Sequence, residues 1–212
     1  MDGIPTGILL GTENFRYFAQ GMTRVYEIPE ESGIASALPE VLSGLPGWRL
    51  EKALSFRRDV DRFLCGKSFL ILEDMLRERF GLSRCPEFSY GSSGKPFLKD
   101  YPDIFFNISH CRKGIAVAVS DSPVGIDIEE IQFDRDLAAA VLSPDEFAAV
   151  VRSEDPAIAF AEIWTRKESF LKLTGEGLRD NMKDVLATAG GVRFRTEVRR
   201  AAGCIVTVAS NQ

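Results

Sequence analysis

The stretch that decides how this chain is organised is VGIDIEE, residues 124–130. Its branched apolar residues alternate with Gly125, Asp127 and Glu129, so an extended strand places the apolar set on one face and both acids on the other. We predict a strand with one face in the core and one small acidic face. Two carboxylates so close together repel, and a divalent cation would compensate their charge. An exposed polar strand face explains the same pattern without a metal.

The overall composition is that of an ordinary globular protein. The chain has 212 residues, 45% of them hydrophobic and 27% charged, which suits one domain or two closely packed halves. A net charge of −5 argues against a surface built for nucleic acid. The N-terminus resembles neither a signal peptide nor an anchor, and no segment approaches the ~20 apolar residues that span a bilayer. We therefore expect a cytoplasmic protein without nucleic-acid or membrane partners.

The four cysteines predict free thiols. They lie far apart in the sequence and form no C-x-x-C pair. A zinc site or a disulfide framework would need closer or paired spacing. Buried, unpaired cysteines are the simpler interpretation.

Three helices stand out from the apolar periodicity and the cap residues. Apolar residues recur every three or four positions over residues 59–80, and Gly81 follows as a stop signal. The sequence SPDE at residues 143–146 combines an N-cap, a first-turn proline and a reciprocal glutamate, so a helix should begin at Ser143. This capping box also explains Glu146 without any catalytic role. A further helix is predicted from about residue 156 to 173.

Strand-like runs occupy the middle and the end of the chain. Residues 87–98 and 103–110 are two such runs around turn residues, and residues 114–131 predict a hairpin with its turn at 120–123. The tail, residues 192–198 and 203–210, predicts two antiparallel strands, and the first 47 residues predict a strand or two and a helix. The fold class is thus α+β, with two similar halves that meet near residues 120–123. No internal sequence repeat is convincing.

The helix EIWTRKESFLKL, residues 162–173, carries a candidate site. Glu168 and Lys172 are four residues apart and share one face, which for this helix alone favours a surface ion pair. Together with Asp127 and Glu129, however, Glu168 completes a set of three carboxylates. Such hard oxygen ligands suit Mg²⁺, with phosphate and water filling the other positions.

Phosphate contacts are predicted around two further segments. Ser109 and His110 end the run FFNISH, where a hydroxyl and a ring N–H could bind phosphate, although a single histidine is more often structural. The sequence GSSGKP at residues 91–96 lacks the spacing of a Walker A motif. It predicts a tight turn that presents Lys95.

Five motifs in order carry a resemblance to a known family. They are GKPFL, FNISH, GIDIEEI, LSPDEF and WTRKESFLKLTGEGL. Together they resemble the 4′-phosphopantetheinyl transferase family, specifically its larger, pseudo-dimeric Sfp type, over about residues 56–180. GIDIE and W-T-x-K-E-S-x-x-K at this separation are specific signals, whereas GKP or SH alone would be weak.

The resemblance implies a fold, a reaction and its partners. It implies two similar α/β halves in a pseudo-twofold arrangement with the active site between them, in a monomer. Residues 1–121 would contact the phosphates and adenine of coenzyme A, and residues 122–212 would hold the metal and the catalytic groups. The reaction would transfer the phosphopantetheine arm of coenzyme A to a serine of an apo acyl or peptidyl carrier protein, with Mg²⁺, and release adenosine 3′,5′-bisphosphate.

The resemblance also implies roles for individual residues. The metal ligands would be Asp127, Glu129 and Glu168. Catalysis would fall to Asp127, Glu168 and Lys172, with Glu168 or a metal-bound water as the base and Lys172 stabilising the leaving bisphosphate. The implied coenzyme contacts are Lys52, Arg62, Lys95, Pro96, Ser109, His110, Lys167 and Lys172.

Two other classes of protein fit parts of the pattern. A non-catalytic coenzyme A or nucleotide-binding protein could share the fold, but the intact set of three acids and two lysines argues against it. A metal-dependent nuclease also pairs acids with lysine, yet no lysine stands two residues after Glu129 and the chain is acidic.

Overall fold

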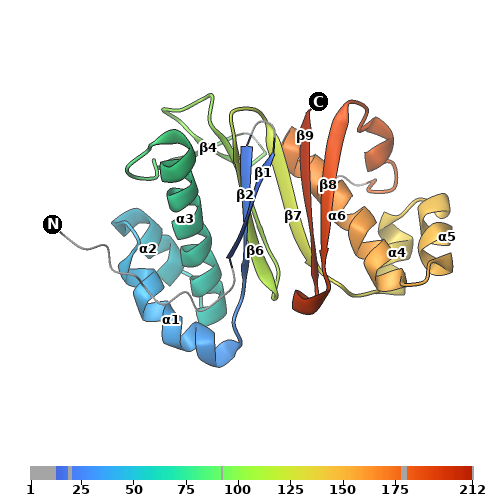
Figure 1. Cartoon of the computed structure of the whole chain (residues 1–212), viewed down its shortest axis with the longest axis horizontal. Helices are drawn as coiled ribbons and strands as arrows, with labels where there is room; N and C mark the ends of the chain where they lie inside the picture. Colours follow the sequence, from blue (N-terminus) through green and yellow to red (C-terminus); the bar gives the residue numbers. More distant parts are fainter. Residues whose placement is uncertain (1–12, 19–20, 92, 178–180, 212) are drawn as a thin grey trace.

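The computed structural model describes residues 13–18, 21–91, 93–177 and 181–211. These residues form two units, each an antiparallel sheet with helices on one face. The two sheets face each other in the middle of the molecule and the helices lie outside them, as Figure 1 shows. The α+β class is therefore confirmed.

The first unit contains a four-stranded sheet in the order β1-β2-β6-β5, with every neighbouring pair antiparallel. A separate two-stranded sheet, β3-β4, lies between its helices and β5 in the sequence. The elements are β1 (Glu13–Phe18), β2 (Gly21–Glu27), α1 (Glu31–Ser43), α2 (Gly47–Leu54), α3 (Asp59–Phe80), β3 (Phe88–Tyr90), β4 (Pro96–Leu98), β5 (Phe105–His110) and β6 (Gly114–Ser120).

The second unit contains a three-stranded antiparallel sheet in the order β7-β9-β8. Its longest helix, α6, packs on this sheet, chiefly on β7 and β9. Short 3₁₀ helices cover Val185–Thr188 and Arg200–Ala202. The elements are β7 (Val124–Glu130), α4 (Arg135–Val141), α5 (Pro144–Arg152), α6 (Pro156–Thr174), β8 (Val192–Arg199) and β9 (Cys204–Asn211).

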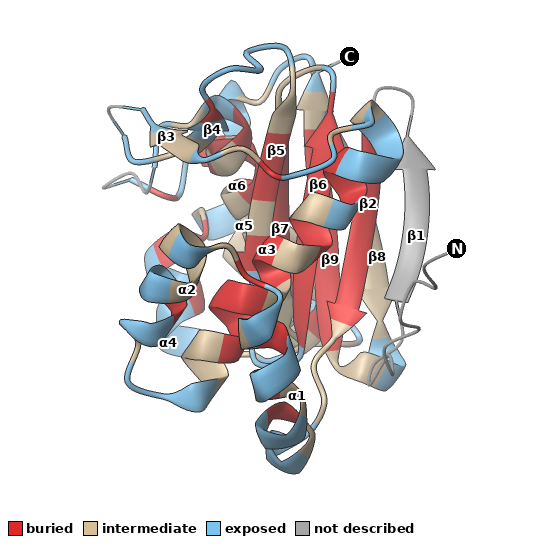
Figure 2. Cartoon of the chain, turned by 90° about the vertical axis from the view of Figure 1, so that its left-hand side faces the viewer, coloured by how far each residue is buried: buried red, intermediate tan, exposed pale blue. Residues whose placement is uncertain are grey.

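The helices follow the sequence signals closely. α3 spans the predicted residues and ends where Gly81 adopts φ +69°, a left-handed conformation that glycine reaches without steric cost. It lies across the buried strands of the first sheet (Figure 2). α5 begins after Ser143 with both hydrogen bonds of the capping box, and α6 covers the third predicted helix. These three predictions are confirmed.

The predicted hairpin of residues 114–131 is wrong. Both strands exist, but β6 pairs with β2 and β5, whereas β7 pairs with β9 in the other sheet. Every residue of β6 is buried and both of its edges are occupied, which is the pattern of a central strand. Residues 121–123 therefore carry the chain from one sheet to the other instead of reversing it within one sheet.

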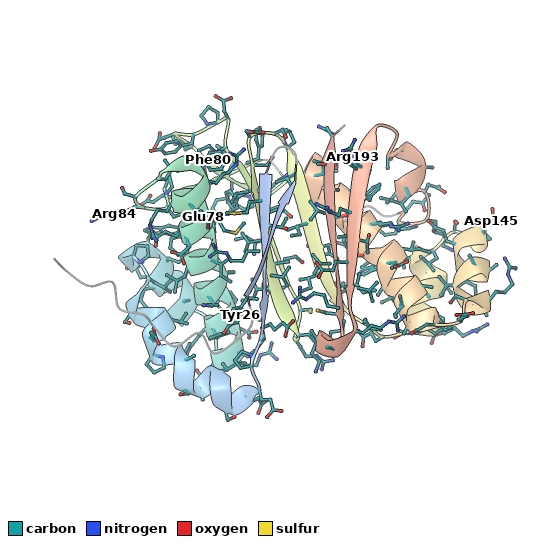
Figure 3. The ribbon with its side chains drawn as sticks, viewed as in Figure 1. Tyr26, Glu78, Phe80, Arg84, Asp145 and Arg193 are labelled. Atoms are coloured by element: carbon teal, nitrogen blue, oxygen red, sulfur yellow. The ribbon has the colours of Figure 1, made fainter. Side chains whose placement is uncertain are left out.

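The alternation in β7 is confirmed. Its apolar residues are at most 1% exposed and face the first sheet, so that side chains from the facing strands fill the space between the sheets (Figure 3). This cluster contains Val25, Ala116, Ala118, Val124, Ile126, Ile128, Cys204, Val206 and Val208. The opposite face of β7 is not an exposed acidic surface, because α6 covers it.

Gly125 lets β7 and α6 approach closely. A Cβ at this position would lie 2.0 Å from the Ser169 oxygen and 2.5 Å from the Leu173 nitrogen, both main-chain atoms that cannot move aside alone. We expect Gly125→Ala to lower the free energy of unfolding by about 1–3 kcal/mol through overpacking. Gly190→Ala is the control, because nothing lies within 4 Å of its Cβ position. Equal denaturant midpoints for the two variants would contradict this account of the packing.

Other predictions on the described residues are confirmed. β8 and β9 are the predicted antiparallel tail strands, and β1, β2 and α1 lie in the first 47 residues, of which 1–12 and 19–20 are outside the description. The four cysteines are free, three of them buried and Cys111 half-buried. Among the described helices, none has the length and hydropathy to cross a bilayer.

Candidate active site

A charged cluster joins the two units where β5, β7 and α6 meet. The Asp127 side chain is buried, with 2% of its surface exposed, and its Oδ1 accepts hydrogen bonds from Ser109 Oγ at 2.8 Å and Lys172 Nζ at 2.6 Å. Lys172 Nζ also donates to Ser109 Oγ at 2.8 Å. The strand alternation aims Asp127 at α6, and the close approach at Gly125 brings Lys172 within reach. The structure thus unites three of the predicted site residues.

Among the described residues, two buried carboxylate oxygens at this cluster have no hydrogen-bond partner. They are Asp127 Oδ2 and Glu168 Oε1. Burying an unpaired carboxylate oxygen is costly, and such oxygens are the ligands that Mg²⁺ prefers. Within the described ranges, no group of three His, Cys, Asp or Glu side chains is already gathered as a metal site. The donor chemistry therefore fits a divalent cation, whereas the coordination sphere is not preformed.

The carboxylates influence one another's protonation. Burial, followed by the charge of Asp127, raises the pKa of Glu129 to about 7, and the same two causes raise the pKa of Glu168. Trp164 Nε1 donates to Glu129 Oε1 at 3.4 Å, and Lys172 partly offsets the negative charge. Three mutually repelling carboxylates with one ammonium leave an excess of negative charge at this position.

The raised pKa of Glu129 predicts a pH-dependent stability in metal-free protein. Its folded-state pKa lies above its ordinary value of 4.5, so the folded state loses stability as the pH rises from about 4.5 to about 7. We expect Glu129→Gln to gain stability relative to the parent between about pH 5 and about pH 8, measured by urea denaturation with EDTA. Glu130→Gln is the control. It should lose stability relative to the parent instead of gaining it, because Arg112 lowers the pKa of Glu130. A pH-independent difference for Glu129→Gln would refute the assignment.

A cavity of about 420 Å³ opens beside the cluster and is lined by both units. Basic side chains outnumber acidic ones on its wall, which suits an anionic ligand. Burial and the charge of Lys172 lower the pKa of His110, which favours the neutral imidazole. A neutral imidazole can donate one hydrogen bond. The cavity is lined by Arg49, Lys52, Phe56, Asp61, Leu64, Cys65, Ser68, Phe88, Tyr90, Pro96, Ile108, Ser109, His110 and Lys172.

Arg49 is a cavity residue that the sequence reasoning missed. Its guanidinium lies 5.5 Å from the centre of the Phe69 ring and 5.7 Å from that of Phe88, and Nη2 donates to the Cys65 oxygen at 2.9 Å. Within the part of the chain that the structure describes, its buried Nε has no hydrogen-bond partner. The spacing of Arg49 and Lys52, three residues apart on α2, places both on one helix face and was the signal that could have identified Arg49.

Two predicted contacts from the first unit are placed differently. Lys52 lines the cavity and lies 5.3 Å over the Phe56 ring. Arg62 is absent from the cavity wall and is held locally, with Nε donating to the Phe56 oxygen at 3.0 Å and Nη1 to Asp59 at 2.9 Å. Lys52 therefore lies on the wall of this cavity, whereas Arg62 does not.

Lys167 does not reach the cluster. Its side chain is fully buried, and five residues along an α-helix turn it by about 140° from Lys172. Its Nζ donates to four acceptors: Val141 O at 3.1 Å, Glu146 Oε2 at 2.7 Å, Met182 O at 2.8 Å and Lys183 O at 3.2 Å. The predicted pyrophosphate contact is corrected to a structural one, because this ammonium has no free donor for a ligand.

Lys95 and Pro96 line a second cavity of about 290 Å³, together with Glu168 and Lys172. The Lys95 ammonium, however, donates to the main-chain oxygens of Lys172 and Leu173. Pro96 borders both cavities. Lys95 therefore lies near Glu168 and Lys172, but its hydrogen bonds go to the main chain of α6.

Comparison with known proteins finds similarity in the region that contains the charged cluster. Residues 123–204, which run from just before β7 to the first residue of β9, match the 4′-phosphopantetheinyl transferase superfamily. The matched region contains Asp127, Glu129, Glu168 and Lys172. It is 35% identical over 127 residues to the 4′-phosphopantetheinyl transferase psf-1 of Bacillus pumilus, which covers 58% of this chain and 54% of that protein. The resemblance predicted from the motifs is confirmed.

Two further relatives give similar coverage. The 4′-phosphopantetheinyl transferase Sfp of Bacillus subtilis (strain 168) is 30% identical over 126 residues, 58% of this chain and 55% of that protein. AcpT of Salmonella typhimurium, another 4′-phosphopantetheinyl transferase, is 43% identical over 100 residues, 44% of this chain and 52% of that protein. The chain thus spans about half the length of these three curated relatives.

Proposed function

We propose that this protein transfers the 4′-phosphopantetheine arm of coenzyme A to a serine of an apo acyl or peptidyl carrier protein, with release of adenosine 3′,5′-bisphosphate. The observation that supports it is the hydrogen-bonded cluster of Ser109, Asp127 and Lys172 beside unpartnered carboxylate oxygens, at the mouth of a basic cavity. Phosphoryl transfer depends mainly on positioning and charge neutralisation, and these groups supply both.

In this proposal the cavity holds the coenzyme's phosphates. The side chains that face them are Arg49, Lys52, Ser109, His110 and Lys172, which offer guanidinium, ammonium, hydroxyl and imidazole donors. Arg49 replaces Arg62 as the guanidinium of the site, because Arg49 lines the cavity and Arg62 does not. Charge-assisted hydrogen bonds of this kind are about twice as strong as neutral ones.

Asp127, Glu129 and Glu168 would hold Mg²⁺, which, when bound, neutralises charge on the transferring phosphate. The carrier serine oxygen attacks the β-phosphorus of coenzyme A. The bond from phosphorus to the serine oxygen forms while the bond to the bridging oxygen breaks. The serine proton would pass to Glu168 or to a water molecule at the site, and the Lys172 ammonium would stabilise the leaving bisphosphate.

The finer architecture belongs to the same proposal. In this proposal the two units are related by a pseudo-twofold axis. A site between them is supported by the cavity, because Lys172 of the second unit lines it together with residues of the first unit. Residues 1–121 then contact the phosphates and adenine, and residues 122–212 hold the metal and the catalytic groups. The protein acts as a cytoplasmic monomer whose partners are coenzyme A and a carrier protein, without nucleic acid or membrane.

The direct test is the intact mass of an apo carrier protein incubated with this protein, coenzyme A and Mg²⁺. We expect the carrier to gain the mass of phosphopantetheine, and EDTA to prevent the gain. Calorimetry of coenzyme A binding runs in parallel. Tight binding without mass gain on several carriers would support the non-catalytic alternative, and metal-dependent cleavage of DNA would support a nuclease.

The cavity assignment predicts a preference among donors. Dephospho-coenzyme A lacks the 3′-phosphate, so we expect its kcat/KM to be about 10- to 100-fold lower than that of coenzyme A, the loss of one charged hydrogen bond. In Arg49→Met the difference between the two donors should shrink, whereas Arg62→Met, the matched control, should keep it. Equal use of both donors by the parent protein would remove the 3′-phosphate from this cavity.

A further inference from the structure

The segment between β3 and β4 is fastened to the C-terminal end of α6. Lys95 Nζ donates to the main-chain oxygen of Lys172 and, at 3.2 Å, to that of Leu173. Ser93 Oγ in the same turn donates to the main-chain oxygen of Gly175. These contacts join positions 77–82 residues apart in the sequence and link the two units directly.

The end of α6 needs such donors. The last four carbonyl groups of an α-helix have no partner within the helix, and the helix dipole makes this end partly negative. Lys95 supplies a cation there from a distant segment, and burial lowers the pKa of Lys95, as expected for an ammonium that has exchanged water for carbonyl oxygens. Gly175, at φ +74°, ends the helix next to the Lys95 side chain. A Cβ at position 175 would lie 3.3 Å from Lys95 Cδ.

The residue held by this contact is Lys172, whose side chain bonds Asp127 and Ser109. We propose that Lys95 is a positioning residue, which fixes the last turn of α6 and thereby the Lys172 ammonium, and that it does not bind the phosphates of the coenzyme. The continuous path runs from the Lys95 ammonium to the main chain of Lys172, and from the Lys172 ammonium to Asp127. Its consequence for catalysis rests on the proposed function, whereas its consequence for α6 does not.

Hydrogen exchange of the ligand-free protein tests the structural half. In Lys95→Met we expect amides of residues 171–177 to exchange about tenfold faster, the equivalent of losing one hydrogen bond to a charged group. Lys95→Arg, which keeps a cationic donor, should restore protection, and Ser93→Ala should loosen the same amides less. Lys99→Met, an exposed lysine just after β4, is the control. Unchanged exchange in Lys95→Met would overturn the proposal.

Ligand binding and turnover test the positioning role. In Lys95→Met we expect kcat to fall about tenfold, while the Kd for adenosine 3′,5′-bisphosphate by calorimetry changes less than about threefold, with recovery in Lys95→Arg. A variant whose bisphosphate affinity falls tenfold while its exchange is normal would identify Lys95 as a phosphate ligand and overturn the proposal. If the parent protein shows no transfer to any carrier, the proposed function fails, and exchange and bisphosphate affinity still decide the role of Lys95.

Discussion

Asp127→Asn is expected to reduce kcat/KM for carrier modification by about 10³-fold, because it removes a negative charge from the proposed metal site. The fold should survive. Asparagine keeps a side-chain oxygen that can accept from Ser109 Oγ and Lys172 Nζ, and Lys172 is 28% exposed, so its ammonium retains some water. Transfer measured by intact mass and unfolding measured by denaturation give the two quantities.

Glu130→Gln is the matched control for this loss. Glu130 lies on the same strand as Asp127 but pairs with the exposed Arg112, away from the cluster. We expect near-parental activity from it. Near-parental activity in Asp127→Asn would show the metal assignment to be wrong, and unfolding of that variant would show that Asp127 is chiefly structural.

Lys167→Met is expected to lower the free energy of unfolding by about 3–5 kcal/mol, the usual effect of removing one partner of a buried charged pair. The substitution leaves Glu146 and three main-chain oxygens without their common donor. Urea denaturation followed by circular dichroism measures the loss. Activity per folded molecule should change far less than stability.

The exposed Lys99 provides the control, and Lys99→Met should stay within about 0.5 kcal/mol of the parent. A double-mutant cycle with Glu146→Gln isolates the ion pair, because the two side chains are in direct contact at 2.7 Å. A Lys167→Met protein that is fully stable but inactive would restore the pyrophosphate role that the structure contradicts.

Periodicity and cap residues predicted the helices and strands themselves better than they predicted which strands pair with each other. The spacing over residues 59–80 and the capping box at Ser143 depend only on neighbours along the chain, so both helices were predictable. The pairing of β6 and β7 was not. A short turn between two buried strands is compatible with a hairpin and with a passage between sheets, and only the strands on either side, β2, β5 and β9, decide between them.

In the candidate site, too, some features were predictable from the sequence and others were not. Asp127 and Glu129 were predictable from alternation in one strand, and Glu168 with Lys172 from helical spacing. The direction of a long basic side chain was not predictable, because Lys95, Lys167 and Arg62 each had local or distant acceptors that spacing does not show. Arg49 was missed because the sequence reasoning did not use its three-residue spacing from Lys52, which places both side chains on one face of α2.

The measurement closest to the central claim is a time course in which the mass of the carrier protein and released adenosine 3′,5′-bisphosphate are quantified in one reaction. The account predicts equal amounts of modified carrier and bisphosphate, formed with Mg²⁺ and coenzyme A, lost with EDTA or in Asp127→Asn, and retained in Glu130→Gln. Bisphosphate released without carrier modification, or modification that persists undiminished in Asp127→Asn, would contradict it.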